Sequence, residues 1–335
     1  VWIMPLSRVI ENFDIAKNKF DVVILDEASQ SDVLGLVAFA MGKEVVVVGD
    51  DEQVSPYAIG QDVIAIQALI DEMLKDIPNK QLYDGKTSIY DLAGHCFGAT
   101  IRLVEHFRCA PDIIQFSNSL CYNGEIKPLR EATSTQVYPH LVAYRLTDGF
   151  SKDKLNEKEA IVTASLVAAI CELPEYVGLS IGVICLVGID QSLCIDSILR
   201  RRLSPDEYLR RKLVCGNASQ FQGDERDVML LSVVDSAGQG PLPLRQSDVY
   251  RKIFNVAASR ARDQLWVIHS LNPGTDLKDG DLRLRLIKHA EDPSALRRQF
   301  ETGEGRTDSE FERLVLRDLT NCGYRVVCQW EVGAY

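Results

Sequence analysis

The sequence lacks the features that would place it in a membrane, secreted or zinc-stabilised class. No apolar run is long enough to cross a bilayer, and residues 1–6 carry neither a basic start nor a small-residue cleavage site. Histidine is scarce, and none of the 9 cysteines has a partner at C-x-x-C spacing. This cysteine pattern argues against a zinc site and is typical of thiols in a reducing compartment. We therefore expect a cytoplasmic protein without a membrane partner.

The composition is that of an ordinary folded protein. Hydrophobic residues make up 46% and charged residues 25% of the 335 positions, which excludes a disordered chain and allows two or three domains. The net charge of −11 argues mildly against nucleic-acid binding, which usually needs a basic surface. Total charge does not determine the charge of one groove, however, and basic residues are dense at 200–202, 210–212 and 283–285. A solvated helix surface is the simpler interpretation of those three runs.

Short runs rich in Val and Ile predict a parallel α/β architecture. Residues 22–25 and 44–48 are each followed by acidic residues, and residues 33–41 between them predict a helix that Gly42 terminates. Such a β-α-β unit places functional groups at the carboxyl ends of its strands. Residues 60–98 are expected to be mainly helical. A second α/β block is predicted from strands at 141–145, 181–186, 229–234 and 265–268 and from helices at 111–120, 157–172, 191–202 and 253–262.

Two acidic side chains follow the first predicted strand, in the segment Phe20-Asp-Val-Val-Ile-Leu-Asp-Glu-Ala-Ser-Gln30. Nucleotide hydrolysis needs one carboxylate to hold a magnesium shell and a second to orient and deprotonate the attacking water. Asp26 and Glu27 are placed to supply both. The alternative is a solvated loop, or a helix N-terminus that favours acidic residues for electrostatic reasons.

A polar turn follows the second predicted strand, in Gly49-Asp-Asp-Glu-Gln-Val-Ser-Pro56. Gly49 permits a sharp change of direction. The amide of Gln53 can both donate to a phosphate and accept from a water molecule, which suits a sensor of the nucleotide's terminal phosphate. The alternative is a plain turn, because Gly, Asp, Ser and Pro are the residues that turns prefer.

These two segments resemble motifs II and III of superfamily 1 helicases of the Upf-like branch. Three further segments follow in the order that this family shows. Glu105-His-Phe-Arg-Cys-Ala-Pro111 is similar to motif IV, Asn217-Ala-Ser-Gln-Phe-Gln-Gly-Asp-Glu225 to motif V, and Asn255-Val-Ala-Ala-Ser-Arg-Ala-Arg262 to motif VI. Each match alone is a weak signal, but five matches in order are specific.

The resemblance implies an α/β fold with two RecA-like P-loop NTPase-type parallel-sheet domains, and with ATP and Mg²⁺ as cofactors. Residues 1–98 would be the C-terminal part of the first, incomplete domain, with a helical insertion. Residues 99–271 would form the second domain and residues 272–306 a connector. By motif matching, Asp26 would hold Mg²⁺ through water, Glu27 would be the catalytic base and Gln53 would read the γ-phosphate.

The same matching assigns the phosphate-neutralising arginines to Arg108 and Arg260, and adds Gly223 and Glu225 to the nucleotide-binding set. A planar guanidinium neutralises charge on a transferring phosphoryl group. The alternative for both arginines is a surface ion pair, which is less expected for Arg260 because it stands among small residues that we assign to the start of a helix.

Motif V also implies a nucleic-acid contact. Ser219, Phe221 and Gln222 offer polar groups for phosphate and an aromatic ring for stacking on a base. Phe221 could equally be a core residue, since phenylalanine is often buried. The partner would be single-stranded or duplex nucleic acid, with DNA expected rather than RNA.

Two departures from the family pattern limit these expectations. The chain contains no G-x-x-x-x-G-K-[ST] sequence, so we expect the P-loop upstream of an N-terminal truncation and an isolated chain that is inactive. Residues 181–191 stand where related helicases often carry a Pro-Tyr-x-x-Gln turn, but they lack the Pro-Tyr pair.

The tail at 307–335 is similar to the start of an endonuclease-like domain of the very-short-patch-repair or restriction type. Glu310 or Glu312 would then be a metal-binding acid, with the next one beyond Tyr335 in a truncated domain. The alternative is a capping box from Ser309 to Glu312 on an ordinary amphipathic helix. The complete protein is expected to be an ATP-dependent nucleic-acid helicase or translocase coupled to a nuclease. The alternatives are an ATP-gated nucleic-acid-binding switch and a nuclease-loading ATPase without unwinding activity.

Overall fold

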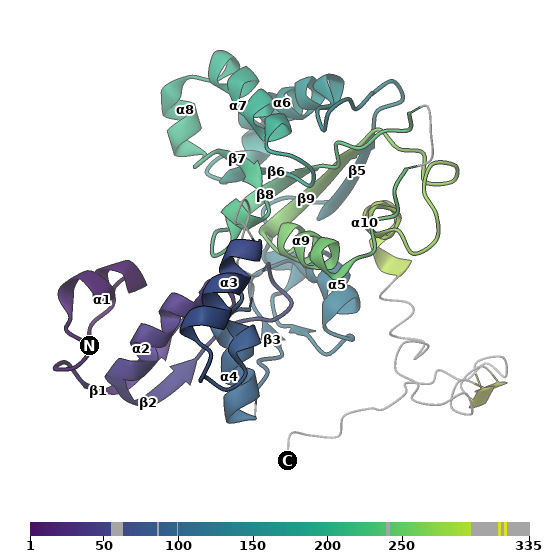
Figure 1. The fold of residues 1–335 in the computed structure, drawn as a ribbon. Helices are drawn as coiled ribbons and strands as arrows, with labels where there is room; N and C mark the ends of the chain where they lie inside the picture. Colours follow the sequence, from purple (N-terminus) through teal and green to yellow (C-terminus); the bar gives the residue numbers. More distant parts are fainter. Residues whose placement is uncertain are drawn as a thin grey trace. The chain divides into compact units, whose positions relative to one another are not determined.

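The computed structural model describes residues 1–54, 63–85, 87–98, 100–238 and 242–295, together with 314–315 and 318–319. Glu310 and Glu312, the candidate nuclease acids, lie outside the described residues. The chain divides into two compact units, Val1–Leu103 and Val104–Tyr335. They are described separately below, and both are drawn in Figure 1.

The first unit contains the predicted β-α-β arrangement. Strand β1 (Phe20–Leu25) pairs in parallel with β2 (Gly42–Val47), and α2 (Leu36–Met41) connects them. The helix is shorter than expected because Asp32 caps a separate turn at Val33–Gly35, where its carboxylate accepts from the Leu34 amide at 2.9 Å. The remaining helices of this unit are α1 (Leu6–Asn12), α3 (Val63–Met73) and α4 (Ile89–Phe97).

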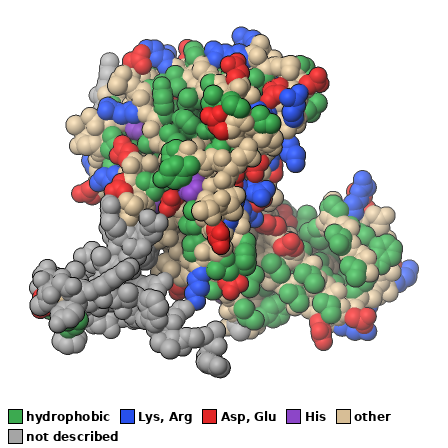
Figure 2. Space-filling view, turned by 180° about the vertical axis from the view of Figure 1, so that it is seen from behind, with side chains coloured by type: hydrophobic (Ala, Val, Ile, Leu, Met, Phe, Trp, Pro, Cys, Tyr) green, Lys and Arg blue, Asp and Glu red, His purple; other side chains and the backbone are tan. Residues whose placement is uncertain are grey.

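The core of the first unit lies on one face of this two-stranded sheet. Ala28 packs with Ile89 and Leu92 of α4, and side chains of β1, β2 and α2 surround them. On the strands, alternate apolar residues are exposed, including Ile24 at 66% and Val46 at 46%. Figure 2 shows many hydrophobic side chains on the surface of this unit.

The second unit is built on a five-stranded sheet with the order β5-β9-β8-β6-β7, in which every pair is parallel. The predicted parallel α/β class is therefore confirmed. The strand β7 was not predicted, because it has four residues and includes Gly216. The strands are β5 (Leu141–Arg145), β6 (Ile181–Cys185), β7 (Val214–Asn217), β8 (Arg226–Ser232) and β9 (Ala261–His269).

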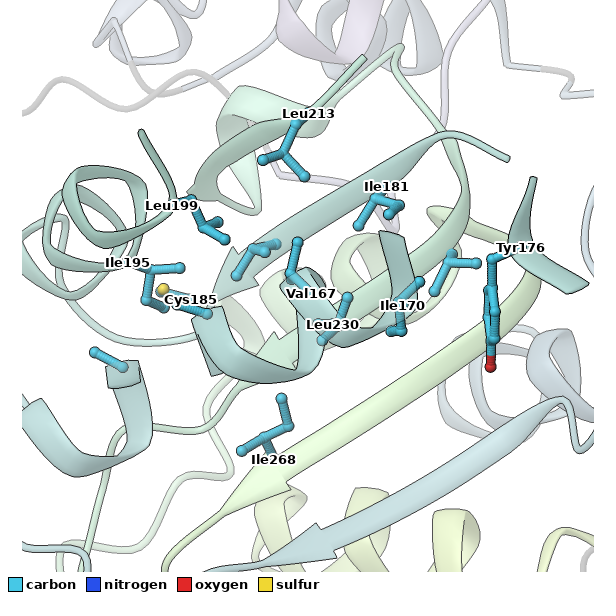
Figure 3. Close-up of a cluster of buried hydrophobic side chains, with 14 of the residues drawn as sticks. Val167, Ile170, Tyr176, Ile181, Cys185, Ile195, Leu199, Leu213, Leu230 and Ile268 are labelled. Atoms are coloured by element: carbon cyan, nitrogen blue, oxygen red, sulfur yellow. The ribbon is translucent and has the colours of Figure 1, made fainter. Parts of the chain in front are cut away.

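Helices cover both faces of this sheet (Figure 1). On one face, α6 and α7 contribute Val167, Ile195 and Leu199 to a fully buried cluster with strand residues such as Leu230 (Figure 3). Each such side chain contributes roughly 1.5–3 kcal/mol when it is removed from water. Within residues 104–295, leaving out the undescribed 239–241, the α-helices are α5 (Pro111–Cys121), α6 (Glu157–Glu172), α7 (Asp190–Arg202), α8 (Pro205–Arg210), α9 (Asp248–Ala258) and α10 (Leu282–Glu291). A separate parallel pair is formed by β3 (Glu105–His106) and β4 (Lys127–Pro128).

One expectation about this unit is wrong. The helix expected at 253–262 ends at Ala258, because pairing of Ala261 with Arg226 draws the following residues into β9. Arg260 therefore lies in the turn after a helix and not at the start of one.

The expected connector at 272–306 contains α10, which buries Leu286 and Ile287 completely. The many charged residues of α10 gave no sign in the sequence that this helix is buried. In the structure, the buried Arg283 is neutralised by ion pairs with Asp235 and Asp281, each at 2.6 Å. No helix among the described residues has both the length and the apolar character that a membrane crossing requires.

Candidate functional site

The two candidate carboxylates of the first unit stand at the carboxyl end of β1. Glu27 has a left-handed backbone conformation, with φ 53°, and its amide donates to Oδ1 of Asp26 at 2.9 Å. Its own carboxylate accepts from the Gln30 side chain at 2.6 Å. Both acids are exposed, so a nucleotide or a water molecule can reach them. A left-handed non-glycine residue is uncommon and often marks a functional turn.

The polar turn after β2 packs directly against this segment. A Cβ atom on Gly49 would lie 3.0 Å from the Ser29 amide nitrogen, so only glycine permits the approach. The Asp50 amide donates to the Ser29 hydroxyl at 3.4 Å, and the Gln53 side chain donates to Asp50 at 3.1 Å. The structure therefore brings Asp26, Glu27 and Gln53 to the same edge of the parallel pair.

Three segments of the second unit meet around Glu225. Its carboxylate forms an ion pair with Arg108, and the two side chains are 37% and 39% exposed. A second arginine, Arg262, lies 3.7 Å from the other carboxylate oxygen of Glu225 and 3.6 Å from Asp227. Arg262 stands at the end of motif VI, but sequence reasoning gave it no role. Glu225 thus lies between arginines from motifs IV and VI.

Arg260 is 3% exposed and belongs to the same region. Its side chain donates to the Val256 carbonyl and to the Ser259 hydroxyl, both at 3.3 Å, and its carbonyl accepts from the Arg226 amide at 3.0 Å. A surface ion pair does not describe a side chain buried to this degree. Arg260 and Glu225 directly precede β9 and β8, so they lie at the amino edge of the large sheet.

The positive charges of Arg108 and Arg260 both act on the side chain of His106. Burial, and then the positive charges of Arg108 and Arg260, lower the pKa of His106 to about 4. The neutral ring accepts a hydrogen bond from the Cys109 amide at 3.0 Å through Nε2. Burial raises the pKa of the Cys109 thiol to about 12, which makes that cysteine a structural residue and not a nucleophile.

The nucleic-acid residues assigned to motif V have different surroundings. Ser219 is exposed and Gln222 is half-buried, but Phe221 is fully buried, with the Arg226 guanidinium 5.9 Å from its ring centre. The expectation that Phe221 stacks on a base is therefore wrong, because its ring has no free face. Gly223 is exposed with φ +72°, and nothing lies within 4 Å of the position a Cβ would take.

The sequence did not predict a polar network that lies at the opposite edge of the large sheet. The fully buried Glu159 accepts hydrogen bonds from the Ser232 hydroxyl at 2.7 Å and the Val234 amide at 2.8 Å. Burial, opposed by these hydrogen bonds, raises its pKa to about 7. Gln191, in the segment without Pro-Tyr, is also buried there and donates to the Asn156 carbonyl at 3.1 Å. These residues are far apart in the sequence and meet only in the folded protein, so no local motif predicts the network.

The chain is similar to a family model, a curated relative and a solved structure. Residues 85–272 match a family model described as an AAA domain. An uncharacterized ATP-dependent helicase of Methanocaldococcus jannaschii is 23% identical over 268 residues, which are 76% of this chain and 36% of that protein. A solved arterivirus nonstructural protein 10 (helicase) in complex with DNA has a TM-score of 0.37 and 13% identity, covering 81% of this chain and 43% of that one. The chain spans less than half the length of either protein. Because the family model covers more than half of the chain, the protein belongs to the AAA domain family.

Proposed function

We propose that this chain supplies the hydrolytic and arginine-bearing parts of an ATP-dependent nucleic-acid helicase or translocase. The observation that carries the proposal is the meeting of Arg108, Glu225 and Arg260, which come from three distant segments and gather at one edge of the large sheet. An arginine that reaches a transferring phosphoryl group stabilises the negative charge of its transition state. The helicase-like relative supports the same conclusion.

The carboxylates of the first unit fit the chemistry of a magnesium nucleotide. Magnesium is usually held by one or two carboxylates together with substrate phosphates, and not by a protein cage. Asp26 and Glu27 are exposed neighbours at a strand end, and no group of three or more ligating side chains occurs among the described residues. Asp26 would hold the metal's water shell. Glu27 would take a proton from the attacking water, and Gln53 would contact the terminal phosphate.

The phosphate cradle is the part that these 335 residues do not contain, since no P-loop sequence is present. The backbone amides and the lysine of that loop supply most of the binding to nucleotide phosphates. We therefore propose that hydrolysis requires a P-loop from outside this chain. We also propose that the motor works on DNA in the cytoplasm and, through the tail at 307–335, is coupled to a nuclease.

A strand-displacement assay on a polypeptide that joins this chain to its P-loop tests the proposal. We expect ATP-dependent release of a labelled strand from a partial duplex, together with nucleic-acid-stimulated hydrolysis. Hydrolysis and binding without displacement would show a nucleic-acid-binding switch instead of a helicase. Absence of hydrolysis with an intact P-loop would contradict both assignments.

A further inference from the structure

A single guanidinium joins the backbones of two arginine-bearing segments. Arg130 lies two residues after β4, in a stretch without any recognised motif. Its Nη1 atom donates to the carbonyl of Arg108 and to the carbonyl of Arg262, each at 2.8 Å. Its Nη2 atom pairs with the carboxylate of Asp263. The side chain of Arg130 is 14% exposed and that of Asp263 is 7% exposed.

The motif IV segment, residues 105–111, depends on contacts of this kind for its position. Its strand β3 pairs with β4 and is not part of the five-stranded sheet. The Ala110 amide donates to the Arg262 carbonyl at 2.8 Å, and the Cys109 thiol donates to the Ser259 carbonyl at 3.4 Å. Arg130 adds a second donor to the Arg262 carbonyl, so it closes a bridge between motif IV and motif VI.

Arginine is suited to this bridge in a way that lysine is not. Its planar fork presents several donors in fixed directions, whereas a lysine ammonium is a compact point charge on a flexible stem. Two carbonyl oxygens, the Ser134 hydroxyl and one carboxylate accept hydrogen bonds from the Arg130 guanidinium. The carboxylate compensates its charge in a region that already holds Arg108, Arg260 and Arg262. Charge-assisted bonds of this kind are stronger than neutral ones when they are shielded from water.

We propose that Arg130 is a positioning residue that sets the spacing of Arg108 and Arg260 by clamping the motif IV backbone to the motif VI backbone. The inference rests on the proposed function, because those two arginines are the side chains assigned to the nucleotide's phosphates. Arg130 itself needs no contact with nucleotide. It acts through the carbonyl groups of the residues that it holds.

The first test uses the 335-residue chain and does not depend on hydrolysis. In the Arg130→Lys variant we expect faster amide hydrogen exchange at residues 105–111, and a His106 pKa that rises from about 4 toward its ordinary value of 6.5 in an NMR titration. The matched control is Arg211→Lys. Arg211 is 3% exposed and donates to the Leu179 and Cys171 carbonyls, far from motif IV in sequence. Unchanged exchange and titration in Arg130→Lys, or equal changes in both variants, would overturn the proposal.

The second test measures hydrolysis by the polypeptide that includes the P-loop. Arg130→Lys should lower kcat on the order of 10- to 100-fold with little change in KM for ATP, because small misplacements of catalytic groups have effects of this size. Arg211→Lys should retain the wild-type kcat. A wild-type kcat in Arg130→Lys, despite faster exchange at 105–111, would overturn the positioning role. If the wild-type polypeptide does not hydrolyse ATP, the proposed function fails, and the exchange and titration results alone decide whether the clamp exists.

Discussion

Arg108 and Glu225 form an ion pair between two segments that are far apart in the sequence. Each side chain remains more than a third exposed, so the pair is open to solvent and to an incoming anion. Exposed pairs of this type contribute little to stability, with a typical range of about 0–1 kcal/mol. The pair therefore holds Arg108 in a defined direction without binding it so tightly that a phosphate could not replace Glu225.

The first prediction follows from that balance. Glu225→Gln should change the free energy of unfolding by less than about 1 kcal/mol in urea titrations of the 335-residue chain. In the polypeptide with a P-loop, the same variant should alter the rate of hydrolysis, because Arg108 loses the partner that orients it. Asp148→Asn, which removes the carboxylate of another exposed ion pair, is the control. A large loss of stability would show that Glu225 is structural.

Second, the purified 335-residue chain should hydrolyse ATP at a negligible rate, since it has no phosphate cradle. A phosphate-release assay with Mg²⁺ and single-stranded DNA measures this directly. Robust magnesium-dependent turnover by the chain alone would contradict the requirement for a P-loop from outside it.

Third, Glu27→Gln in the polypeptide with a P-loop should retain ATP binding and abolish turnover. The substitution preserves the size of the side chain and removes the group that accepts the proton. Glu44→Gln changes an exposed glutamate of β2 in the same way and should have no effect. Turnover within a few-fold of wild type would exclude Glu27 as the base.

Fourth, Arg260→Ala should reduce turnover on the order of 10³-fold, the usual size of an arginine-finger effect. Single-strand binding without nucleotide, measured by fluorescence anisotropy, should change little. Because Arg260 is buried, the variant's unfolding midpoint must be compared with wild type. An equal loss of turnover and of strand binding would indicate a folding defect, and not a catalytic role.

Fifth, the half-buried His106 and the buried His269 should make the second unit sensitive to acid. The pKa of His106 and that of His269 are each lowered to about 4 from 6.5, mainly by burial. Below pH 6.5 the unfolded chain therefore binds protons that the folded chain does not, so stability falls as the pH drops from 6.5 toward 4. Replacing His106 with Gln should flatten this dependence in urea titrations, whereas replacing the exposed His95 should not. An unchanged slope for His106→Gln would contradict the lowered pKa.

The parallel α/β class and the positions of most strands could be predicted from the sequence alone. Buried parallel strands read as continuous Val and Ile runs, and turn residues mark where they end. The sequence also placed Asp26, Glu27 and Gln53 at one sheet edge, because the carboxyl ends of consecutive parallel strands lie together. These signals are local, because each depends only on residues within a few positions in the sequence.

The remaining features could be seen only in the folded protein. The burial of Phe221, the pairing of Arg108 with Glu225 and the bridge made by Arg130 depend on contacts between distant segments. The charged residues of α10 likewise gave no indication of burial. Arg283 is buried there because Asp235 and Asp281 compensate its positive charge. Local pattern reports how polar a side chain is. The local sequence does not show which partner the fold places beside that side chain. That partner determines whether a charged side chain is a solvated surface group, a structural ion pair or a candidate catalytic group.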